Sequence, residues 1–436
     1  MKASFSNAST ASHRRVDPLG LGLMLFAGLN LNGVILLFLG AEAFLSPIIL
    51  LLTIIMCIKY ARIAYVTPSY LLFALTVASY LLFGGLAGIL GSSFNSSYIT
   101  SYGATILLVS AIHFWLASVD EAELTRILTI LKNILLVSCV MVILSDVIRP
   151  YQVTPMMPGI DADQLRQGME SADRASGFFE NPNEAAMIAL YCIVLIAALP
   201  SSSLPLRLVQ GAVAVVALIM TFSKAGMLTL LVLTALFLLT RRSFMTLVLS
   251  AVGLVLVFSG LWFVFENDLL NLSWEQRERL SDVLNLAGGE INERSTTGRN
   301  VLFEMGFEKI TSNFPWGAGL GEFHAMEGGV RKVAGGIEVN EWLGIHNTFL
   351  MIAGEGGMVP LVMLLVFLLS LLTYGVSAPH RGIVYGFTII LMSDMMVSHH
   401  VLLLRFADMF LGVVLALLAF SPRHANVKYS MLPRMS

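Results

Sequence analysis

The chain has 436 residues, of which 57% are hydrophobic and 12% are charged, and its formal net charge is −2. A soluble domain needs about a quarter charged residues, so this composition excludes an ordinary water-soluble protein and indicates a polytopic membrane protein. The small net charge, without a basic stripe, a Walker loop or a GxGxxG loop opening a helix, indicates that nucleic acid is not a partner.

Apolar segments long enough to cross a hydrocarbon core of about 30 Å recur along the whole chain. We predict about twelve of them, and therefore an all-α polytopic membrane protein formed by one integral membrane domain, residues 1–436. The first segment is too long for a signal peptide and lacks a small-residue cleavage site, which predicts a retained helix. The predicted spans are 19–40, 42–60, 69–90, 101–118, 127–148, 183–200, 207–222, 225–240, 244–265, 346–373, 383–399 and 401–420.

Lysine and arginine in short loops resist translocation and therefore indicate the orientation of the chain. They gather on one side, which we predict to be cytoplasmic together with both termini. Two long polar loops, 149–182 and 266–345, then lie outside, in the periplasm of a cell with two membranes. The cations on the predicted inner side are Lys2, Arg14, Arg15, Lys59, Arg62, Arg126, Arg207, Arg241, Arg242, Arg381, Arg423, Lys428 and Arg434. The three cysteines fall inside apolar spans, which predicts buried small side chains rather than disulfides.

Two polar clusters on the predicted outer side contain a cation beside a helix start. Arg174 precedes an Asn-Pro-Asn turn at 181–183, where free helix amides and the arginine can hold an anion; an ordinary helix cap is the alternative. Ser223 and Lys224 form a tight hairpin between two spans. A lysine at that depth needs water or a counter-charge, because an unpaired buried ammonium costs several kcal/mol; a surface lysine is the alternative.

A third polar cluster lies within and just after the 266–345 loop. The hydroxyls at 295–297 predict an N-cap for a helix over 298–311, and Arg299 falls in its first turn. The helix dipole disfavours a cation there unless a phosphate is bound by the amides and the guanidinium together. His346 follows at the start of the tenth span. A lone histidine in such a place is more often a cap or interface residue, but here it shares its face with three anion-friendly clusters.

These groups suit a diphosphate-linked donor better than a neutral solute. Cleaving a sugar from a lipid diphosphate needs charge neutralisation on the leaving group and a base for the incoming hydroxyl. Arg299 and Lys224 can neutralise the diphosphate without a metal, and His346, with an ordinary pKa of about 6.5, can serve as the base. We predict no metal and no other cofactor, since the adjacent His399 and His400 would point in different directions on a helix.

With these clusters in this order, the chain resembles the O-antigen ligase-related family of membrane glycosyltransferases. The resemblance covers most of the chain and is densest from about 174 to 360; the order of the motifs makes the combination fairly specific. The matching pieces are Arg174-x-x-Gly with Asn181-Pro182-Asn183-Glu184, Ser223-Lys224, Gly298-Arg299, Pro315-x-Gly317-x-Gly319-x-Gly321-x-Phe323, and His346-Asn347-x-x-Leu350 followed by Gly356-Gly357.

The resemblance implies a metal-independent transfer of a glycan from undecaprenyl diphosphate to a sugar hydroxyl, with inversion, at the periplasmic face of the bacterial inner membrane. Lys224 and Arg299 would hold the diphosphate with Arg174 beside them, and His346 would activate or orient the acceptor. The acceptor would be a growing O-antigen or exopolysaccharide in a polymerase, or lipid A-core in a ligase. Many members have Ser-Arg where this chain has Ser223-Lys224, and lysine provides a point charge rather than a planar fork. A flippase or a chain-length protein would be its partner.

Two other classes remain open at this stage. A secondary transporter would also have about twelve spans and buried charges, but the chain has no evident half-to-half repeat and gathers its polar groups on one face. The second class is a non-catalytic component of a polysaccharide export system.

The predicted spans also contain charged residues. Asp394 marks either a functional residue or a buried pair, and Arg405 with Asp408 predicts an i, i+3 ion pair. Glu355 is about half a turn out of phase with His346, which predicts no direct contact between them.

Overall fold

The computed structural model describes most of the chain. The described residues are 16–39, 46–91, 96–148, 174–179, 181–200, 203–240, 263, 274–287, 299–323, 331–334, 337–340, 345–377, 379–398 and 400–430. The predicted cap at 295–297, His399, nearly all of the predicted span 244–265 and most of the loop 149–182 lie outside these residues.

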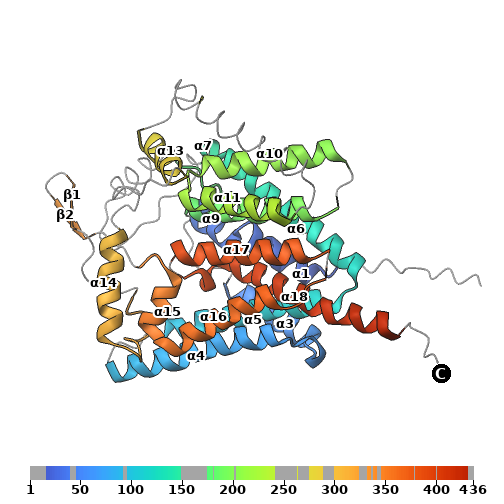
Figure 1. Ribbon diagram of the computed structural model, residues 1–436, viewed down its shortest axis with the longest axis horizontal. Helices are drawn as coiled ribbons and strands as arrows, with labels where there is room; N and C mark the ends of the chain where they lie inside the picture. Colours follow the sequence, from blue (N-terminus) through green and yellow to red (C-terminus); the bar gives the residue numbers. More distant parts are fainter. Residues whose placement is uncertain are drawn as a thin grey trace, which may run out of the picture.

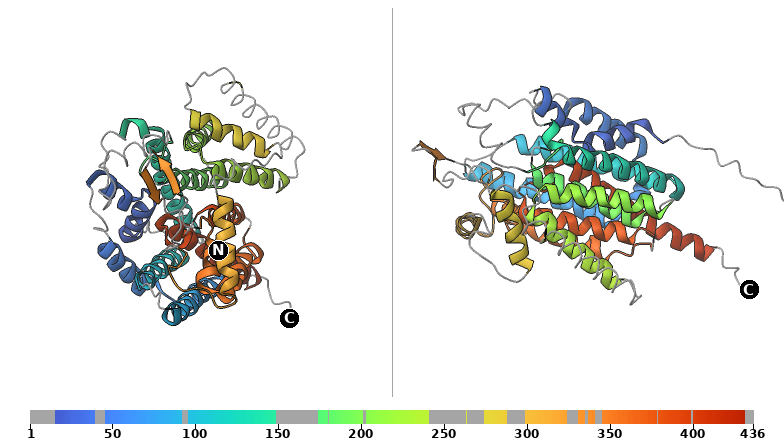
Figure 2. Two further views of the ribbon diagram at one scale, coloured as in Figure 1. Left: turned by 90° about the vertical axis from the view of Figure 1, so that its left-hand side faces the viewer. Right: turned by 90° about the horizontal axis from the view of Figure 1, so that it is seen from above.

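The described part is almost entirely helical, as the composition predicts, and its long helices pack side by side in one bundle (Figures 1 and 2). The helices are α1 Pro18–Gly28, α2 Leu31–Leu39, α3 Ser46–Tyr60, α4 Pro68–Gly91, α5 Ser97–Ser118, α6 Glu121–Ile143, α7 Ser145–Ile148, α9 Pro182–Ala198, α10 Leu204–Met220, α11 Lys224–Thr240, α13 Trp274–Ala287, α14 Arg299–Ser312, α15 Thr348–Gly356, α16 Met358–Thr373, α17 Arg381–Val397 and α18 Arg405–Ser430. Two short 3₁₀ turns are η1 Ile63–Tyr65 and η4 Val401–Leu403. The long loop also contains an antiparallel hairpin, β1 Arg331–Ala334 and β2 Ile337–Asn340, with Arg331 opposite Asn340.

Three of the described helices, α4, α5 and α6, are long and apolar enough to cross a membrane by length and composition. Six further apolar helices have 10–17 residues. Large apolar side chains such as Leu82 and Leu365 are exposed on the outside of the bundle, as expected for a surface that faces lipid. The chain is therefore a membrane protein of the helical class.

Four of the predicted continuous spans are interrupted in the structure. The segment 127–148 contains the end of α6 and all of α7, with Leu144 between them, and the segment 401–420 begins with η4 before α18. The segment 19–40 forms α1 and α2, because Asn30 between them adopts a left-handed conformation with φ 47° and its Nδ2 donates to the carbonyl oxygen of Phe178 at 3.1 Å. The segment 346–373 forms α15 and α16, separated by Gly357 with φ 81°. A Cβ on Gly357 would lie 2.2 Å from the Pro315 carbonyl oxygen, so glycine is required there.

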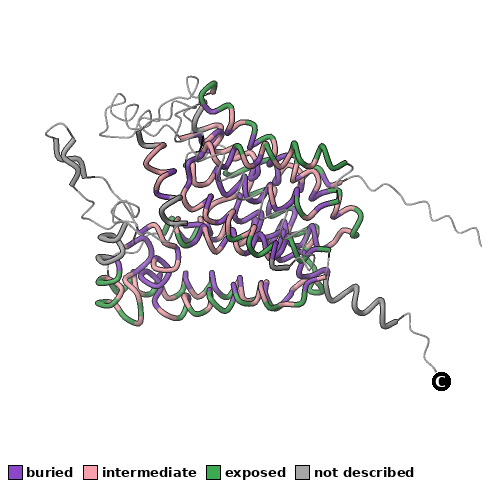
Figure 3. Tube along the Cα trace, turned by 45° about the horizontal axis from the view of Figure 1, so that its top comes forward, coloured by how far each residue is buried: buried purple, intermediate pink, exposed green. Residues whose placement is uncertain are grey.

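Buried residues line the interior of the bundle (Figure 3), and most of those on α9 and α18 are apolar. The rings of Tyr191 on α9 and Phe410 on α18 stack with centroids 3.7 Å apart. A small residue lets α18 approach α5 closely, since a Cβ on Gly412 of α18 would lie 2.8 Å from Ile112 on α5. Without a hydrophobic driving force in lipid, such close packing is the main attraction between spans.

The polar elements collect at one end of this bundle. Helix α14 lies across that end, roughly perpendicular to the bundle axis, and α13, the hairpin and the start of α15 lie near it (Figure 1). The last turns of α18 lie at the opposite end (Figure 1). The fold therefore gathers the sequence clusters, which are far apart along the chain, on one face.

Candidate functional site

The first two predicted clusters meet at the start of α9. Arg174 Nε donates to the Thr221 carbonyl oxygen at 2.9 Å, and its terminal nitrogen donates to Asn183 Oδ1, also at 2.9 Å. Ser223 Oγ donates to the same Asn183 oxygen at 2.9 Å. The predicted cap is confirmed, since the Asn181 side chain accepts from the Asn183 amide. Arg174 thus ties the start of α9 to the turn between α10 and α11.

That turn is the predicted hairpin at Ser223 and Lys224. Helix α10 ends at Met220 and α11 begins at Lys224, and Phe222 between them has a left-handed φ of 45°. Ser223 Oγ accepts from the Gly226 amide at 3.2 Å and so caps the first turn of α11. The hairpin holds Lys224 at the first position of its helix.

Lys224 has a counter-charge that the sequence did not indicate. Its ammonium forms an ion pair with Asp282 on α13, and the two side chains are only 16% and 10% exposed. The expectation that this lysine needs an anion is therefore met by a carboxylate of the 266–345 loop. The two residues are 58 positions apart and belong to no common motif, so only the packing of α13 against α11 reveals the pair.

His346 lies directly before α15, as predicted, at the junction of three helices. Asn347 caps α15 by accepting from the Leu350 amide at 3.0 Å, and Thr348 Oγ1 donates to the Ser398 carbonyl oxygen at the end of α17 at 2.9 Å. On the other side of His346, the buried Ile345 packs on α14, where a Cβ on Gly306 would lie 2.1 Å from Ile345 Cδ1. The histidine is half-buried, with its backbone held on both sides.

Arg299 is the first residue of α14, in agreement with the helix predicted over 298–311. Its side chain lies outside the described part of the chain. Gly306, seven residues further along α14, contacts Ile345, the neighbour of His346. Seven residues of α-helix rise by about 10 Å, so Arg299 lies about 10 Å along the helix axis from this contact. Arg299 therefore begins a helix whose middle, at Gly306, packs beside Ile345, the neighbour of His346.

The glycine-rich run after α14 forms an ordered turn against α15. The amide of Ala318 donates to the Gly354 carbonyl oxygen at 2.7 Å, and the amide of Gly319 donates to the Glu355 carbonyl oxygen at 3.1 Å. Gly317 and Gly319 have φ values of 86° and 115°, which side-chain-bearing residues rarely adopt. A Cβ on Gly317 would lie 2.5 Å from the Glu355 carbonyl oxygen. The glycines are therefore required by backbone geometry and close approach.

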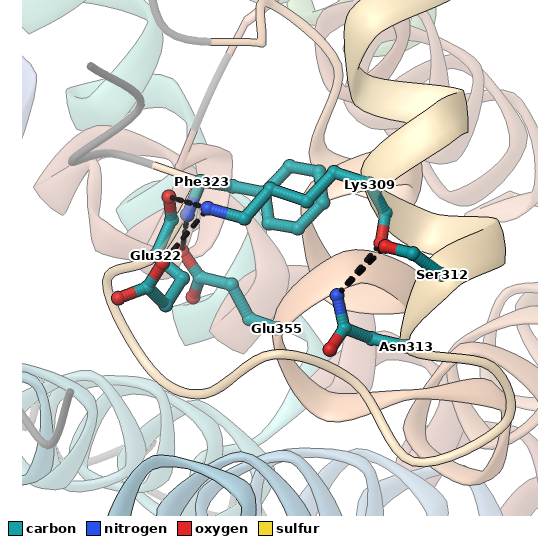
Figure 4. A network of polar contacts seen from close by, with 6 residues as sticks. All are labelled: Lys309, Ser312, Asn313, Glu322, Phe323 and Glu355. Carbon is teal, nitrogen blue, oxygen red and sulfur yellow. Dashed lines mark hydrogen bonds and ion pairs between the residues drawn. The ribbon is translucent and has the colours of Figure 1, made fainter. Parts of the chain in front are cut away.

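A polar network links α14, this turn and α15 (Figure 4). Lys309 Nζ pairs with the Glu322 carboxylate at 2.8 Å and donates to the Glu322 carbonyl oxygen at 3.2 Å. The Phe323 amide donates to Glu355 Oε1 at 3.2 Å, and the Tyr80 hydroxyl of α4 donates to Glu355 Oε2. Sequence reasoning predicted only that Glu355 would not contact His346, and it missed this network.

The other intramembrane charges pair with nearby groups. Arg405 and Asp408 form the predicted i, i+3 ion pair at 3.3 Å. Asp394 Oδ1 accepts from Ser398 Oγ at 2.5 Å, and the His400 ring lies within 3.3 Å of the Tyr98 hydroxyl and 3.5 Å of the Tyr102 hydroxyl. Within the described ranges, no group of three His, Cys, Asp or Glu side chains is arranged to hold a metal ion.

The comparison with protein families matches residues 211–365 to the family described as O-antigen ligase. This segment contains Lys224, Arg299, the glycine-rich run and His346, whereas Arg174 precedes it. The match agrees with the resemblance drawn from the motifs and covers less than half of the chain. No curated protein matches the chain.

Proposed function

Because residues 211–365 match the O-antigen ligase family, which supports a role in polysaccharide assembly, we propose that the protein is a membrane glycosyltransferase. It transfers a glycan from undecaprenyl diphosphate to a sugar hydroxyl, without a metal and with inversion. The observation that carries the proposal is that α14, which begins with Arg299, lies at the same end of the bundle as the start of α15 beside His346 (Figure 1).

The proposed topology has about twelve spans, both termini in the cytoplasm and the α14 end in the periplasm. It rests on the asymmetric distribution of lysine and arginine in the short loops. The placement of α14 across the end of the bundle suits a position at a membrane surface (Figure 1). In a cell with two membranes, the protein then resides in the inner membrane, where lipid-linked glycans can reach the site laterally.

In the proposed reaction, the acceptor hydroxyl attacks the anomeric carbon of the donor sugar, and the bond between that carbon and the diphosphate oxygen breaks. His346 takes the hydroxyl proton, and undecaprenyl diphosphate leaves with the bonding electron pair. Arg299 and Lys224, with Arg174 beside the start of α11, stabilise the negative charge that develops on the leaving group. Amides at the start of α14 would add to this stabilisation. Engagement of Lys224 requires Asp282 to share or release the ammonium.

Deleting the gene and analysing lipid-linked glycans tests the function directly. Full-length glycan accumulating on undecaprenyl diphosphate identifies a ligase, and single repeat units accumulating there identify a polymerase. Surface lipopolysaccharide and secreted polysaccharide are measured in the same strains. Normal lipid-linked glycans and normal polysaccharide in the deletion strain would reject the glycosyltransferase and favour a different role in the membrane.

Lys224 has a separate, quantitative prediction. Replacing it by methionine is expected to lower the transfer rate by about 10²-fold, because one charge on the leaving group is no longer neutralised. Lys224→Arg is expected to retain activity if charge alone matters, and to lose it if the compact ammonium is needed. Initial transfer rates of the reconstituted protein measure both.

The matched control for Lys224 is Asp282→Asn, which removes the ion pair but keeps the ammonium. It is expected to retain far more activity than Lys224→Met. If both variants lose the same activity, the lysine acts through its ion pair with α13, and its proposed contact with the diphosphate is wrong.

A further inference from the structure

Glu355 is a fully buried carboxylate that joins three separate segments. It belongs to α15 and is 0% exposed. Oε2 accepts from the Tyr80 hydroxyl of α4, and Oε1 accepts from the Phe323 amide of the glycine-rich turn at 3.2 Å. A buried carboxylate without partners would be costly, so its hydrogen bonds strongly favour this one arrangement.

The same turn is also bonded to α14. Lys309 bonds both the side chain and the backbone of Glu322, and its Nζ lies 5.6 Å from the centroid of the Phe323 ring (Figure 4). These contacts involve a cation, a carboxylate and an aromatic face, each of which has a preferred geometry. A continuous set of bonds therefore runs from α14 through Glu322 and Phe323 to Glu355 on α15.

The Phe323 ring lies between α14 and α15. A Cβ on Gly354 of α15 would lie 2.1 Å from the Phe323 ring, and a Cβ on Gly306 of α14 would lie 3.8 Å from it. The Gly306 position also touches Ile345, the neighbour of His346. Moving Phe323 would therefore shift α14 relative to the start of α15.

We infer that Glu355 is a positioning residue that, through Phe323 and Glu322, holds α14, with Arg299 at its start, at a fixed separation from His346. This inference rests on the proposed function, because only there do Arg299 and His346 act on one substrate. Glu355 itself touches neither the glycan nor the diphosphate. Its effect on the reaction is to fix the distance between the group that binds the leaving diphosphate and the group that activates the acceptor. An error of about 1 Å in such a distance can lower the rate about 10²-fold.

A distance measurement tests this directly. Spin labels are placed at Glu308→Cys, on the exposed side of α14, and at Met396→Cys, which is 60% exposed on α17 and whose carbonyl oxygen accepts from the Asn347 amide group. Cys57 is replaced by serine, whereas Cys139 and Cys192 are buried and do not compete for the label. Pulsed electron spin resonance in lipid nanodiscs gives the distance distribution, and transfer assays on the same variants give kcat and KM.

Glu355→Ala is expected to broaden the distribution and to lower kcat about 10²-fold, with little change in the donor KM. Glu355→Gln is expected to retain the narrow distribution and most of kcat, because its amide oxygen can accept from Phe323 and its amide nitrogen can donate to the Tyr80 oxygen. Tyr80→Phe, which keeps the ring and removes the donor, provides a second test if Glu355→Ala does not fold. Its control is Tyr70→Phe on the same helix, which removes a bond to Ser110 and is expected to change neither readout.

A narrow, unchanged distribution in Glu355→Ala would overturn the inference, whatever its activity, and the same result in Tyr80→Phe would overturn it if Glu355→Ala does not fold. A purely stabilising role would reduce the amount of folded protein but leave the distance in the folded fraction unchanged. The distance needs no glycan substrate, so the two proposals can fail separately. Broadening in a protein whose unsubstituted form transfers no glycan would support the positioning contact and reject the proposed function.

Discussion

Replacing His346 by alanine is expected to lower the rate of glycan transfer by about 10²- to 10⁴-fold, the usual contribution of a general base. The residue lies directly before α15, and its neighbours fix it there: Asn347 caps the helix and Ile345 packs on α14. The substitution removes the imidazole and leaves the contacts of Asn347 and Ile345 in place. Initial rates with a purified lipid-linked donor, at saturating acceptor, measure the effect on the protein in nanodiscs.

A histidine in the same protein provides the control for this experiment. His380 lies directly before α17, next to Arg381, a cation predicted to lie on the cytoplasmic side, and its Nδ1 is hydrogen-bonded to Ser377 Oγ at 2.9 Å. His380→Ala is expected to affect the stability of the protein more than its transfer rate per folded molecule. Added imidazole is expected to restore part of the rate in His346→Ala alone. Transfer at the unsubstituted rate by His346→Ala would exclude this histidine as the base.

Arg299→Ala is expected to reduce kcat/KM for the donor by about 10²- to 10³-fold, as loss of one preorganised charge contact commonly does. Arg299 begins α14, where backbone amides and the helix dipole favour a phosphate. A lysine at this position is expected to restore only part of the activity, because it cannot form the two parallel hydrogen bonds of a guanidinium. Donor titrations with each variant measure the loss.

The control for Arg299 is Arg277→Ala on α13, which removes a cation from the same long loop outside the matched motifs. It is expected to retain most of the activity if a specific diphosphate contact is involved. An equal loss in both variants would mean that the overall positive charge of the loop attracts the donor, and the specific role of Arg299 would then be rejected.

Local features of the site could be predicted well from the sequence. The helix predicted over 298–311 is α14, Arg299–Ser312, and the hairpin predicted at Ser223 and Lys224 separates α10 from α11. The start of α15 at His346 and Asn347 was also predicted correctly. Capping residues, glycine and long apolar runs act over a few neighbouring residues, so their effects can be inferred without knowing the fold.

The interruptions at Asn30 and Gly357 could not be predicted from the sequence. Asn30 and Gly357 look unremarkable within apolar segments, and hydropathy alone favours continuous helices through both. Their conformations depend on partners elsewhere: Asn30 bonds the Phe178 carbonyl oxygen, and Gly357 lies against Pro315. A turn that is stabilised by a distant segment leaves little local signal.

The sequence by itself determined the membrane class, the order of the motifs and the side chains suited to a diphosphate, because composition, periodicity and capping are local properties. Only the tertiary structure shows which side chains, far apart in the sequence, contact one another. Lys224 with Asp282, and Glu355 with Tyr80, are joined across 58 and 275 positions of the chain. Such pairs depend on how whole helices pack, and helix packing is decided by the sum of many small contacts rather than by any short stretch of sequence.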